Sequence, residues 1–552
     1  MNLYKYVSDA INNKLGFNVS LETPKDREFG DFATNAAMVG AKNMGKNPRE
    51  LANEFVPKLQ ELDFVENVTV AGPGFINLKI KDDFILKNAS VPTQIAAQKQ
   101  NSIDLDYGSY NIGKALHIGH LRTTIVGDTF NRIALFTGHK TKSYNHIGDW
   151  GRPMGLIIAW ILEHGMPKNA NDLNTIYPAS TAKANEDETW LNKARETTAQ
   201  LQNNNPEYIK IYNDFIPMSL KQMDETLQRL NVMPFDMIMG EHGVSEYVPD
   251  VQQILENKKL LEESDGALII NVRQDSDNAP MPPVLFKKNT DANTYAAADL
   301  AAIYYRNKTD NPDEIMYFTD SRQALHFKQI FRAAKLADLT KAKLTHVGFG
   351  TITGKDGKPF KTRDGGVAGL SDILDIAETA VRERVAESEK QLDDKTIKQI
   401  ALSAVKFNDL IHDVQSDYTF DVNAITSFEG RTGPYILYTA VRLQSVLKRA
   451  TSLTTEKPTS YELSADERSL LIQIMDFEHM ILSAFENRAP DMLANYTYDL
   501  CQLANNFYHN CPILRDDITP DIKAGRLFIA KTTFDTLTTA INLMGLQIPN
   551  EM

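Results

Sequence analysis

The sequence predicts a multidomain protein. A central α/β domain with a Rossmann-like parallel sheet is preceded by a small α+β domain and followed by an all-α helical bundle. Three observations lead to this fold class. The chain has 552 residues, more than one hydrophobic core usually organises. Residues 103–163 alternate strand and helix patterns, which is typical of a parallel sheet. From about residue 375 to residue 552 the apolar spacing is helical almost throughout.

The domain boundaries follow from changes in these patterns. Residues 1–88 mix helical patterns with a strand-like segment, and a polar stretch around Pro92 separates them from the next domain. The α/β domain is expected over residues 100–375, interrupted at about 164–290 by a polar, largely helical insertion. Helix and strand then alternate again as far as Phe349, which completes the sheet. The helical domain is expected over residues 376–552.

The composition is that of an ordinary folded protein, with 42% apolar and 24% charged residues and no apolar run near the ~20 residues that span a bilayer. A net charge of −13 argues against a generic nucleic-acid binder, although local basic patches can still hold an RNA. Cys501 and Cys511 are too few for a zinc site; we expect free, buried thiols, with a disulfide between them as the alternative. We expect a cytoplasmic monomer with no membrane contact and no metal site of its own.

The segment 111–122 reads Asn-Ile-Gly-Lys-Ala-Leu-His-Ile-Gly-His-Leu-Arg, which places His117 and His120 between a strand pattern and a helix pattern. A helix N-terminus attracts phosphate, and imidazoles there can donate hydrogen bonds to it. Gly119 leaves room for a nucleotide, and Lys114 adds a cation. The alternative is a purely structural role, in which the two histidines cap the helix and take no part in a reaction.

Several further segments share one family resemblance. The histidine segment, together with Gly148-Asp149-Trp150-Gly151, resembles class I aminoacyl-tRNA synthetases, and within that class it is similar to the arginyl-tRNA synthetase family of bacterial type. The resemblance spans nearly the whole chain. It is also carried by residues 28–35 (Glu-Phe-Gly-Asp-Phe-Ala-Thr-Asn), 71–77 (Ala-Gly-Pro-Gly-Phe-Ile-Asn), 354–363 (Gly-Lys-Asp-Gly-Lys-Pro-Phe-Lys-Thr-Arg), 417–421 and 427–435.

This resemblance implies a ligase that activates L-arginine with ATP, releasing pyrophosphate, and transfers it to the 3′ end of tRNA(Arg). ATP would enter with Mg²⁺, without a permanently bound cofactor. The implied catalytic residues are His117, His120, Lys114, Lys358, Lys361 and Arg363, the last three on a glycine-rich loop that departs from the usual Lys-Met-Ser-Lys pattern. The implied ATP site comprises His117, Gly119, His120, Asp149, Gly350 and Lys361.

A pocket for arginine needs carboxylates that accept a forked guanidinium. Asp106 ends its strand at the edge where open α/β sheets bind ligands, although a glutamate is more usual there in the family. Tyr295 and Asp299 share a helix face, and Gln323 lies near the end of the next strand. By resemblance, Asn111 and His117 hold the amino-acid end. The alternatives are a core aromatic for Tyr295 and a surface ion pair for Asp299.

For tRNA, aromatic faces that stack on unpaired bases are expected near the start of the helical domain, now interpreted as an anticodon-binding domain. The candidates are Tyr435, Tyr438 and Arg442 there, and Phe32, Asn35 and Asn77 in the N-terminal domain, the latter three by resemblance alone. Two other functions stay open: a class I synthetase of cysteinyl or glutaminyl specificity, and a non-catalytic RNA-binding relative that keeps the fold.

Overall fold

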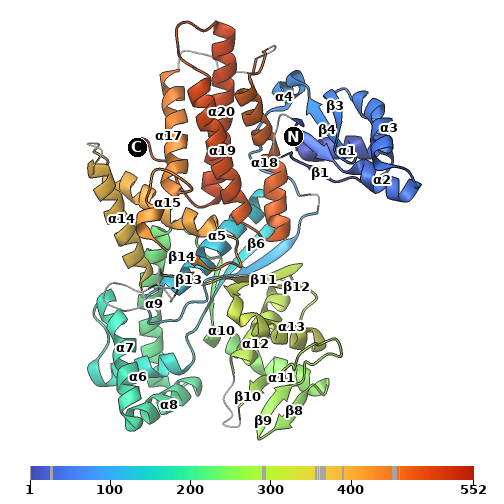
Figure 1. The fold of residues 1–552 in the computed structure, drawn as a ribbon. Helices are drawn as coiled ribbons and strands as arrows, with labels where there is room; N and C mark the ends of the chain where they lie inside the picture. The colour runs from blue at the N-terminus through green and yellow to red at the C-terminus, as the bar shows by residue number, and fades with distance from the viewer. Residues whose placement is uncertain are drawn as a thin grey trace. The chain divides into compact units, whose positions relative to one another are not determined.

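A computed structural model describes residues 2–552 apart from residues 25–28, 98, 289–293, 355–356, 358–359, 361–367, 388–390, 451–454, 456 and 459–460, and apart from the side chains of residues 170–171. The chain divides into two compact units. One consists of Met1–Ile95, Glu389–Ile411 and Ser427–Met552, and the other of Ala96–Ser388 and His412–Thr426. Figure 1 labels helices and strands of both units.

The second unit is built on a five-stranded parallel sheet of order β12-β11-β5-β6-β7. Its strands are β5 (Ser102–Asp106), β6 (Lys140–Ile147), β7 (Met237–Gly240), β11 (Glu314–Asp320) and β12 (Lys343–Phe349). The central strands are buried on both faces, as expected when helices cover a parallel sheet. The crossover helices are α5 (Leu121–Phe136), α6 (Arg152–His164), α12 (Tyr295–Thr309) and α13 (Ala324–Leu336). The predicted Rossmann-like domain is confirmed.

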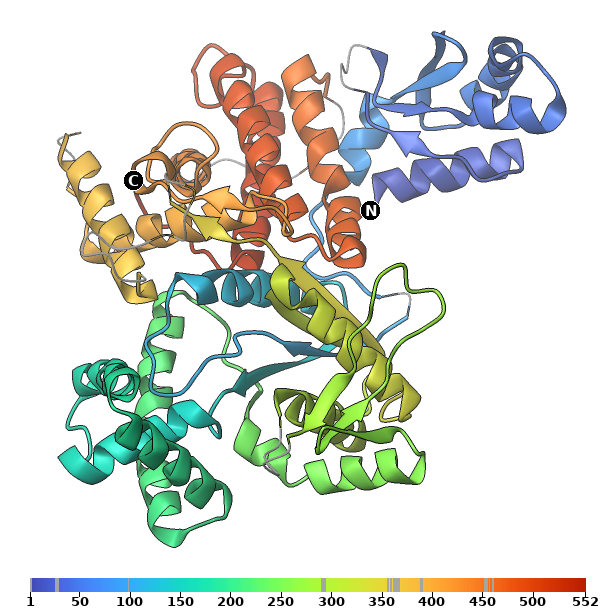
Figure 2. The same ribbon diagram turned by 60° about the horizontal axis from the view of Figure 1, so that its bottom comes forward.

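The segment between the two halves of the sheet differs from the expected helical insertion. It begins with helices α7 (Ala170–Glu186), α8 (Glu188–Gln202) and α9 (Pro206–Arg229). It then contributes β7 to the main sheet, and after α10 (Glu241–Ser245) and α11 (Val248–Asn257) it forms an antiparallel sheet of β8 (Leu261–Ser264), β9 (Ala267–Ile270) and β10 (Val284–Lys287). Figure 2 shows this small sheet apart from helices α6–α9.

The same unit contains several further elements outside the two sheets. These are η2 (Ile118–His120), η3 (Ser321–Gln323), β13 (Ile352–Thr353), α14 (Leu370–Glu387), β14 (Tyr418–Thr419) and α16 (Val422–Ile425). An isolated bridge joins His117 to Gly369, and β13 pairs with β14 in parallel. Gly350 packs so closely on Ser416 that a Cβ atom would lie 2.4 Å from its carbonyl carbon.

The first unit contains the predicted small α+β domain. Its antiparallel sheet has the order β1-β2-β4-β3, formed by β1 (Leu21–Glu22), β2 (Phe32–Thr34), β4 (Phe75–Ile80) and β3 (Val65–Ala71). Its helices are α1 (Leu3–Leu15), α2 (Ala36–Met44), α3 (Pro48–Gln60) and α4 (Asp82–Asn88).

The first unit also contains the predicted helical bundle. It consists of α15 (Asp394–Leu410), α17 (Gly433–Arg449), α18 (Ala465–Asn487), α19 (Asp491–Asn510) and α20 (Pro520–Leu543). Cys501 and Cys511 are both free and buried, as predicted. In the described part of the chain, no helix is both long and apolar enough to cross a membrane.

Candidate active site

Two stacked histidines lie directly before helix α5, where they cap the short 3-10 helix η2 reciprocally. The His117 Nδ1 atom accepts the Gly119 N–H at 3.1 Å, and the His120 Nδ1 atom accepts the His117 N–H at 3.2 Å. Because both Nδ1 atoms accept, each neutral ring carries its proton on Nε2. Their ring centroids lie 3.9 Å apart. A Cβ atom on Gly119 would come within 2.9 Å of the His117 ring, so this close capping requires glycine.

Both imidazoles are neutral at neutral pH. Burial, helped by the nearby Lys114 ammonium, lowers the pKa of His117. Burial, followed by the charges of His117 and Lys114, lowers the pKa of His120 to about 3. The Lys114 ammonium itself lies over the Tyr177 ring of α7, 4.1 Å from its centroid. The helix start therefore presents two uncharged Nε2–H donors and one cation held by an aromatic face.

The segment 148–151 adjoins this helix start through an isolated bridge between Asn111 and Gly148. The Asp149 carboxylate accepts the Tyr212 hydroxyl at 2.6 Å and the His242 N–H at 3.1 Å. Asp149 is only 3% exposed. These bonds fix the Asp149 carboxylate between α9 and α10, and the ATP contact that the sequence predicts for it stays a prediction.

Asp106, which the sequence predicts for the arginine pocket, pairs with an arginine of the protein itself. Asp106 is 3% exposed and forms an ion pair with Arg306, which is 1% exposed. The guanidinium of Arg306 lies between two aromatic rings, with its Cζ atom 4.3 Å from the Tyr144 centroid and 5.3 Å from that of Tyr317. The negative charge of Asp106 is therefore balanced by the guanidinium of Arg306. Sequence alone does not reveal this partner 200 residues away, and the role of Asp106 in binding the substrate stays a prediction.

We call Asp104, Asp106 and Arg306 the inner cluster. Burial raises the pKa of Asp104 to about 7, although the charge of Arg306 opposes the shift. The cluster lies at β5 and α12, where it ties a strand to a crossover helix.

A second group of acids, the outer cluster, consists of Glu241, Asp299 and Tyr295. Burial raises the pKa of Glu241 to about 7, and Asp149 and Asp299 add to the shift. A Cβ atom on Gly151 would lie 3.7 Å from the Glu241 Oε2 atom and 3.8 Å from the Tyr295 hydroxyl, so both side chains face the same glycine. Tyr295 is 67% exposed. Sequence reasoning missed Glu241 because it lies within the segment interpreted as an insertion.

The outer cluster differs from the inner one in its partners. The Asp299 carboxylate accepts from the Nε2 atom of His326 at 2.6 Å. In the described ranges, no lysine or arginine forms an ion pair with Glu241 or Asp299. Gln323, also predicted for this pocket, is exposed at the end of η3.

Four predicted residues remain: Gly350 of the expected ATP site, and Lys358, Lys361 and Arg363 of the expected catalytic loop. Gly350 follows β12 and donates its N–H to the Val414 carbonyl at 3.0 Å, and its close packing on Ser416 requires a glycine. Its contact with ATP stays a prediction. Lys358, Lys361 and Arg363 lie outside the described residues.

The helical bundle brings its predicted residues together. The Arg442 guanidinium lies 4.7 Å from the Tyr438 ring centroid and 4.9 Å from that of Tyr508, and it donates to Asn505 at 2.9 Å. Asn505 in turn donates to the Tyr435 hydroxyl at 2.9 Å. These side chains form one half-buried aromatic and cationic group.

The three candidates in the N-terminal domain face inward. Phe32 is 3% and Asn77 is 7% exposed, and the Oδ1 atom of Asn35 is buried. The ring of Phe32 therefore packs inside the unit and presents no open face on which an RNA base could stack.

Comparison with known proteins agrees with this architecture. Residues 83–422 match the family described as class I tRNA synthetases (R), catalytic domain. Residues 436–552 match the DALR anticodon binding domain, and residues 1–80 match the arginyl tRNA synthetase N terminal domain. An arginine–tRNA ligase of Alkaliphilus oremlandii is 34% identical, with 99% of this chain and 98% of that protein covered. The chain belongs to the arginyl-tRNA synthetase family.

Further relatives support the same assignment. An arginine–tRNA ligase of Shewanella denitrificans is 36% identical over 97% of this chain and 95% of that protein. The structure of Plasmodium falciparum arginyl-tRNA synthetase superposes with a TM-score of 0.85 at 25% identity, covering 100% of this chain and 99% of that one. Thermus thermophilus arginyl-tRNA synthetase shares the fold with a TM-score of 0.86 over 100% of both chains.

The predicted enzyme class is therefore confirmed: the chain is an ATP-dependent arginine–tRNA ligase. The cysteinyl or glutaminyl alternative and the non-catalytic alternative are set aside.

Proposed function

We propose that the outer cluster binds the guanidinium of the substrate arginine. The observation that supports this is that, among the described residues, no lysine or arginine pairs with these acids: Asp299 lies close enough to raise the pKa of Glu241, and the ion-pair partner of Asp299 is a histidine. A guanidinium presents a planar fork of donors that suits two carboxylates and a tyrosine hydroxyl. Asn111 and His117 would hold the amino-acid end, and the exposed Gln323 would close one side.

ATP would lie against the start of α5. The Nε2–H donors of His117 and His120 would stabilise charge that develops on the α-phosphate as the arginine carboxylate attacks it and pyrophosphate leaves. Lys114 would move from the Tyr177 face toward the pyrophosphate, joined by Lys358, Lys361 and Arg363. Mg²⁺ would enter as its complex with ATP, bound by phosphate oxygens.

For tRNA(Arg), the group around Arg442, Tyr435 and Tyr438 would bind unpaired anticodon bases by stacking and by charge. The N-terminal domain would contact the RNA through surfaces other than Phe32. We also propose that the enzyme works in the cytosol as a monomer, which size-exclusion chromatography with light scattering tests: a dimer would contradict it.

The test combines pyrophosphate exchange with charging of tRNA(Arg), using arginine, lysine and citrulline. We expect arginine alone to be a good substrate. Lysine carries a compact charge, and citrulline is a neutral isostere of arginine. In His120→Asn, we expect turnover to fall by about 10²–10³, because one charge-stabilising donor is lost. Efficient use of citrulline would contradict a carboxylate pocket, and near-normal activation by His120→Asn would remove the histidine from the reaction.

A further inference from the structure

One face of helix α18 carries side chains directed at the N-terminal domain. Arg468, Ile472, Asp476 and His479 follow one another at intervals of four, four and three residues, which places them on a single helix face. Ile472 and Asp476 line a small cavity together with Leu3, Thr23, Phe32 and Gln473. His479 stacks on Tyr4 of α1, with ring centroids 3.8 Å apart and an interplanar angle of 8°. This face therefore joins the bundle to the N-terminal domain within one compact unit.

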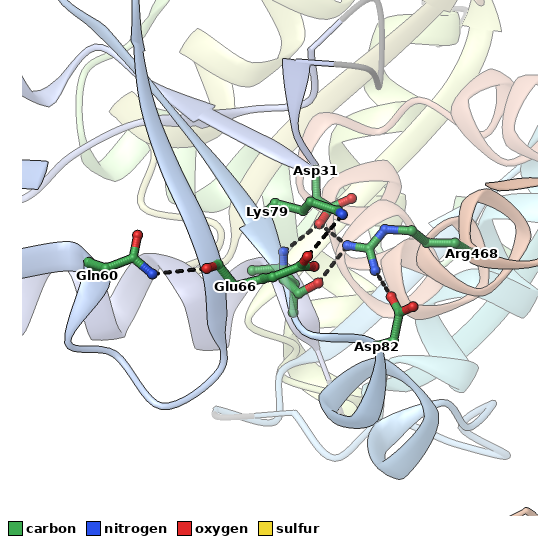
Figure 3. Close-up of polar contacts among 7 residues, drawn as sticks. Asp31, Gln60, Glu66, Lys79, Asp82 and Arg468 are labelled. Atoms are coloured by element: carbon green, nitrogen blue, oxygen red, sulfur yellow. Dashed lines mark hydrogen bonds and ion pairs between the residues drawn. The ribbon is translucent and has the colours of Figure 1, made fainter. Parts of the chain in front are cut away.

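Arg468 is the charged centre of that face (Figure 3). Its guanidinium forms ion pairs with Asp31 and Asp82, and its Nη2 atom donates to the Ile80 carbonyl at 2.6 Å. Its side chain is 13% exposed, and that of Asp31 is 4% exposed. Three acceptors from the N-terminal domain thus converge on one guanidinium of the bundle, in a site with little water to compete.

The partner Asp31 is held rigidly by β4. Its N–H donates to the Leu78 carbonyl at 2.8 Å, and its carboxylate accepts the Ile80 N–H at 2.6 Å. Gly30 precedes it with a φ of +139°, and a Cβ atom there would lie 2.8 Å from the Leu78 oxygen. Phe32 follows and lies edge-on to Tyr4, with centroids 6.3 Å apart. The segment Gly30-Asp31-Phe32, whose Phe32 the sequence suggests as an RNA contact, therefore packs toward α18.

We propose that Arg468 is a positioning residue for tRNA binding: with Asp31, Asp82 and the Tyr4–His479 stack, it fixes the N-terminal domain on the helical bundle. This inference rests on the proposed function, in which both domains contact one tRNA. A fixed domain arrangement raises affinity because the RNA need not select it from a wider ensemble. The segment around Asp31 thus contributes to RNA binding without touching the RNA.

The test compares two buried arginines. Arg468→Met removes the guanidinium between the domains, and Arg526→Met removes a similarly buried one, 15% exposed, that pairs with Glu467 inside the bundle. Spin labels at Asn53→Cys and Glu486→Cys, both exposed positions, report the distance between domains without tRNA, since the native cysteines are buried. Affinity is measured by titrating a fluorescent tRNA(Arg) transcript at fixed salt.

In Arg468→Met we expect a broadened distance distribution and a Kd for tRNA raised about tenfold, as when the competent arrangement falls to about a tenth of the population. Asp82→Asn is a milder change and should shift the distance distribution and the Kd in the same direction. It replaces Arg468→Met in the test if that variant fails to fold. Arg526→Met should lower the melting temperature and leave both readouts unchanged.

A Kd within twofold of the wild type in Arg468→Met, or an equal rise in Arg526→Met, overturns the proposal. Neither readout depends on catalysis. A wild-type protein that binds tRNA(Arg) but does not charge it would contradict the proposed function alone.

Discussion

The inner and outer clusters both contain carboxyl groups, and we propose opposite roles for them. Each has a carboxyl whose pKa burial raises to about 7, Asp104 in one and Glu241 in the other. The inner cluster contains its own guanidinium, Arg306, between two tyrosines. The outer cluster contains no arginine, and an acceptor left without an internal cation is available to a substrate. In this proposal, the presence of an arginine partner distinguishes the structural site from the binding site, because both sites contain carboxyl groups.

The largest expected effect comes from removing the inner guanidinium. Arg306→Met leaves Asp106 buried and unpaired, which costs about 3–5 kcal/mol in the free energy of unfolding. All three tryptophans, Trp150, Trp160 and Trp190, lie in this unit, so their fluorescence follows its unfolding in denaturant.

Arg322→Met is the control, because this arginine forms an exposed ion pair and should change stability by less than about 1 kcal/mol. Adding Asp106→Leu to Arg306→Met should recover much of the loss. Equal midpoints for Arg306→Met and the wild type would contradict a structural role for the inner cluster.

The next effect concerns substrate affinity. Glu241→Gln and Asp299→Asn each remove a negative charge opposite the guanidinium, so we expect the KM for arginine to rise about 100-fold, with the KM for ATP changed by less than about threefold. Asp106→Asn should instead show its main effect in the unfolding midpoint. If Asp106→Asn raised the arginine KM as much as Asp299→Asn, the distinction between the two clusters would fail.

The outer cluster should also make arginine binding depend on pH. Arginine binds the ionised form of Glu241, whose pKa in the free enzyme is raised to about 7, so binding releases a proton. Affinity should therefore rise with pH, by about tenfold between pH 6 and pH 8, and level off above. Calorimetric titration in two buffers measures both affinity and proton release. A profile that stayed the same in Glu241→Gln would assign the dependence to another group.

The smallest expected effect tests His326. Its hydrogen bond orients Asp299 without supplying the permanent charge of an arginine. His326→Phe should raise the arginine KM about fivefold, the cost of one hydrogen bond, while His326→Gln should retain most of the affinity. A much larger rise would mean that this histidine contacts the substrate itself.

Sequence reasoning succeeded where local patterns carry the information. The strand, histidine pair and helix at residues 102–136 are contiguous, so period and capping identify them. It failed where partners are distant: nothing near Asp106 shows that Arg306 pairs with it. It also failed where elements are very short, as in β7 and β8, each four residues long, the latter largely exposed. Glu241 follows β7 directly, so missing that strand meant missing this acid.

The inner cluster also has a use in protein engineering. Tyr144, Tyr317 and Asp106 enclose a planar cation, so Arg306→Ala would leave a hole whose walls match free guanidinium in shape and charge. Millimolar guanidinium, far below denaturing concentrations, would refill the hole and bind the folded state alone, which stabilises that state by mass action. The variant would become a ligase whose folding is controlled by a small ion added to the buffer.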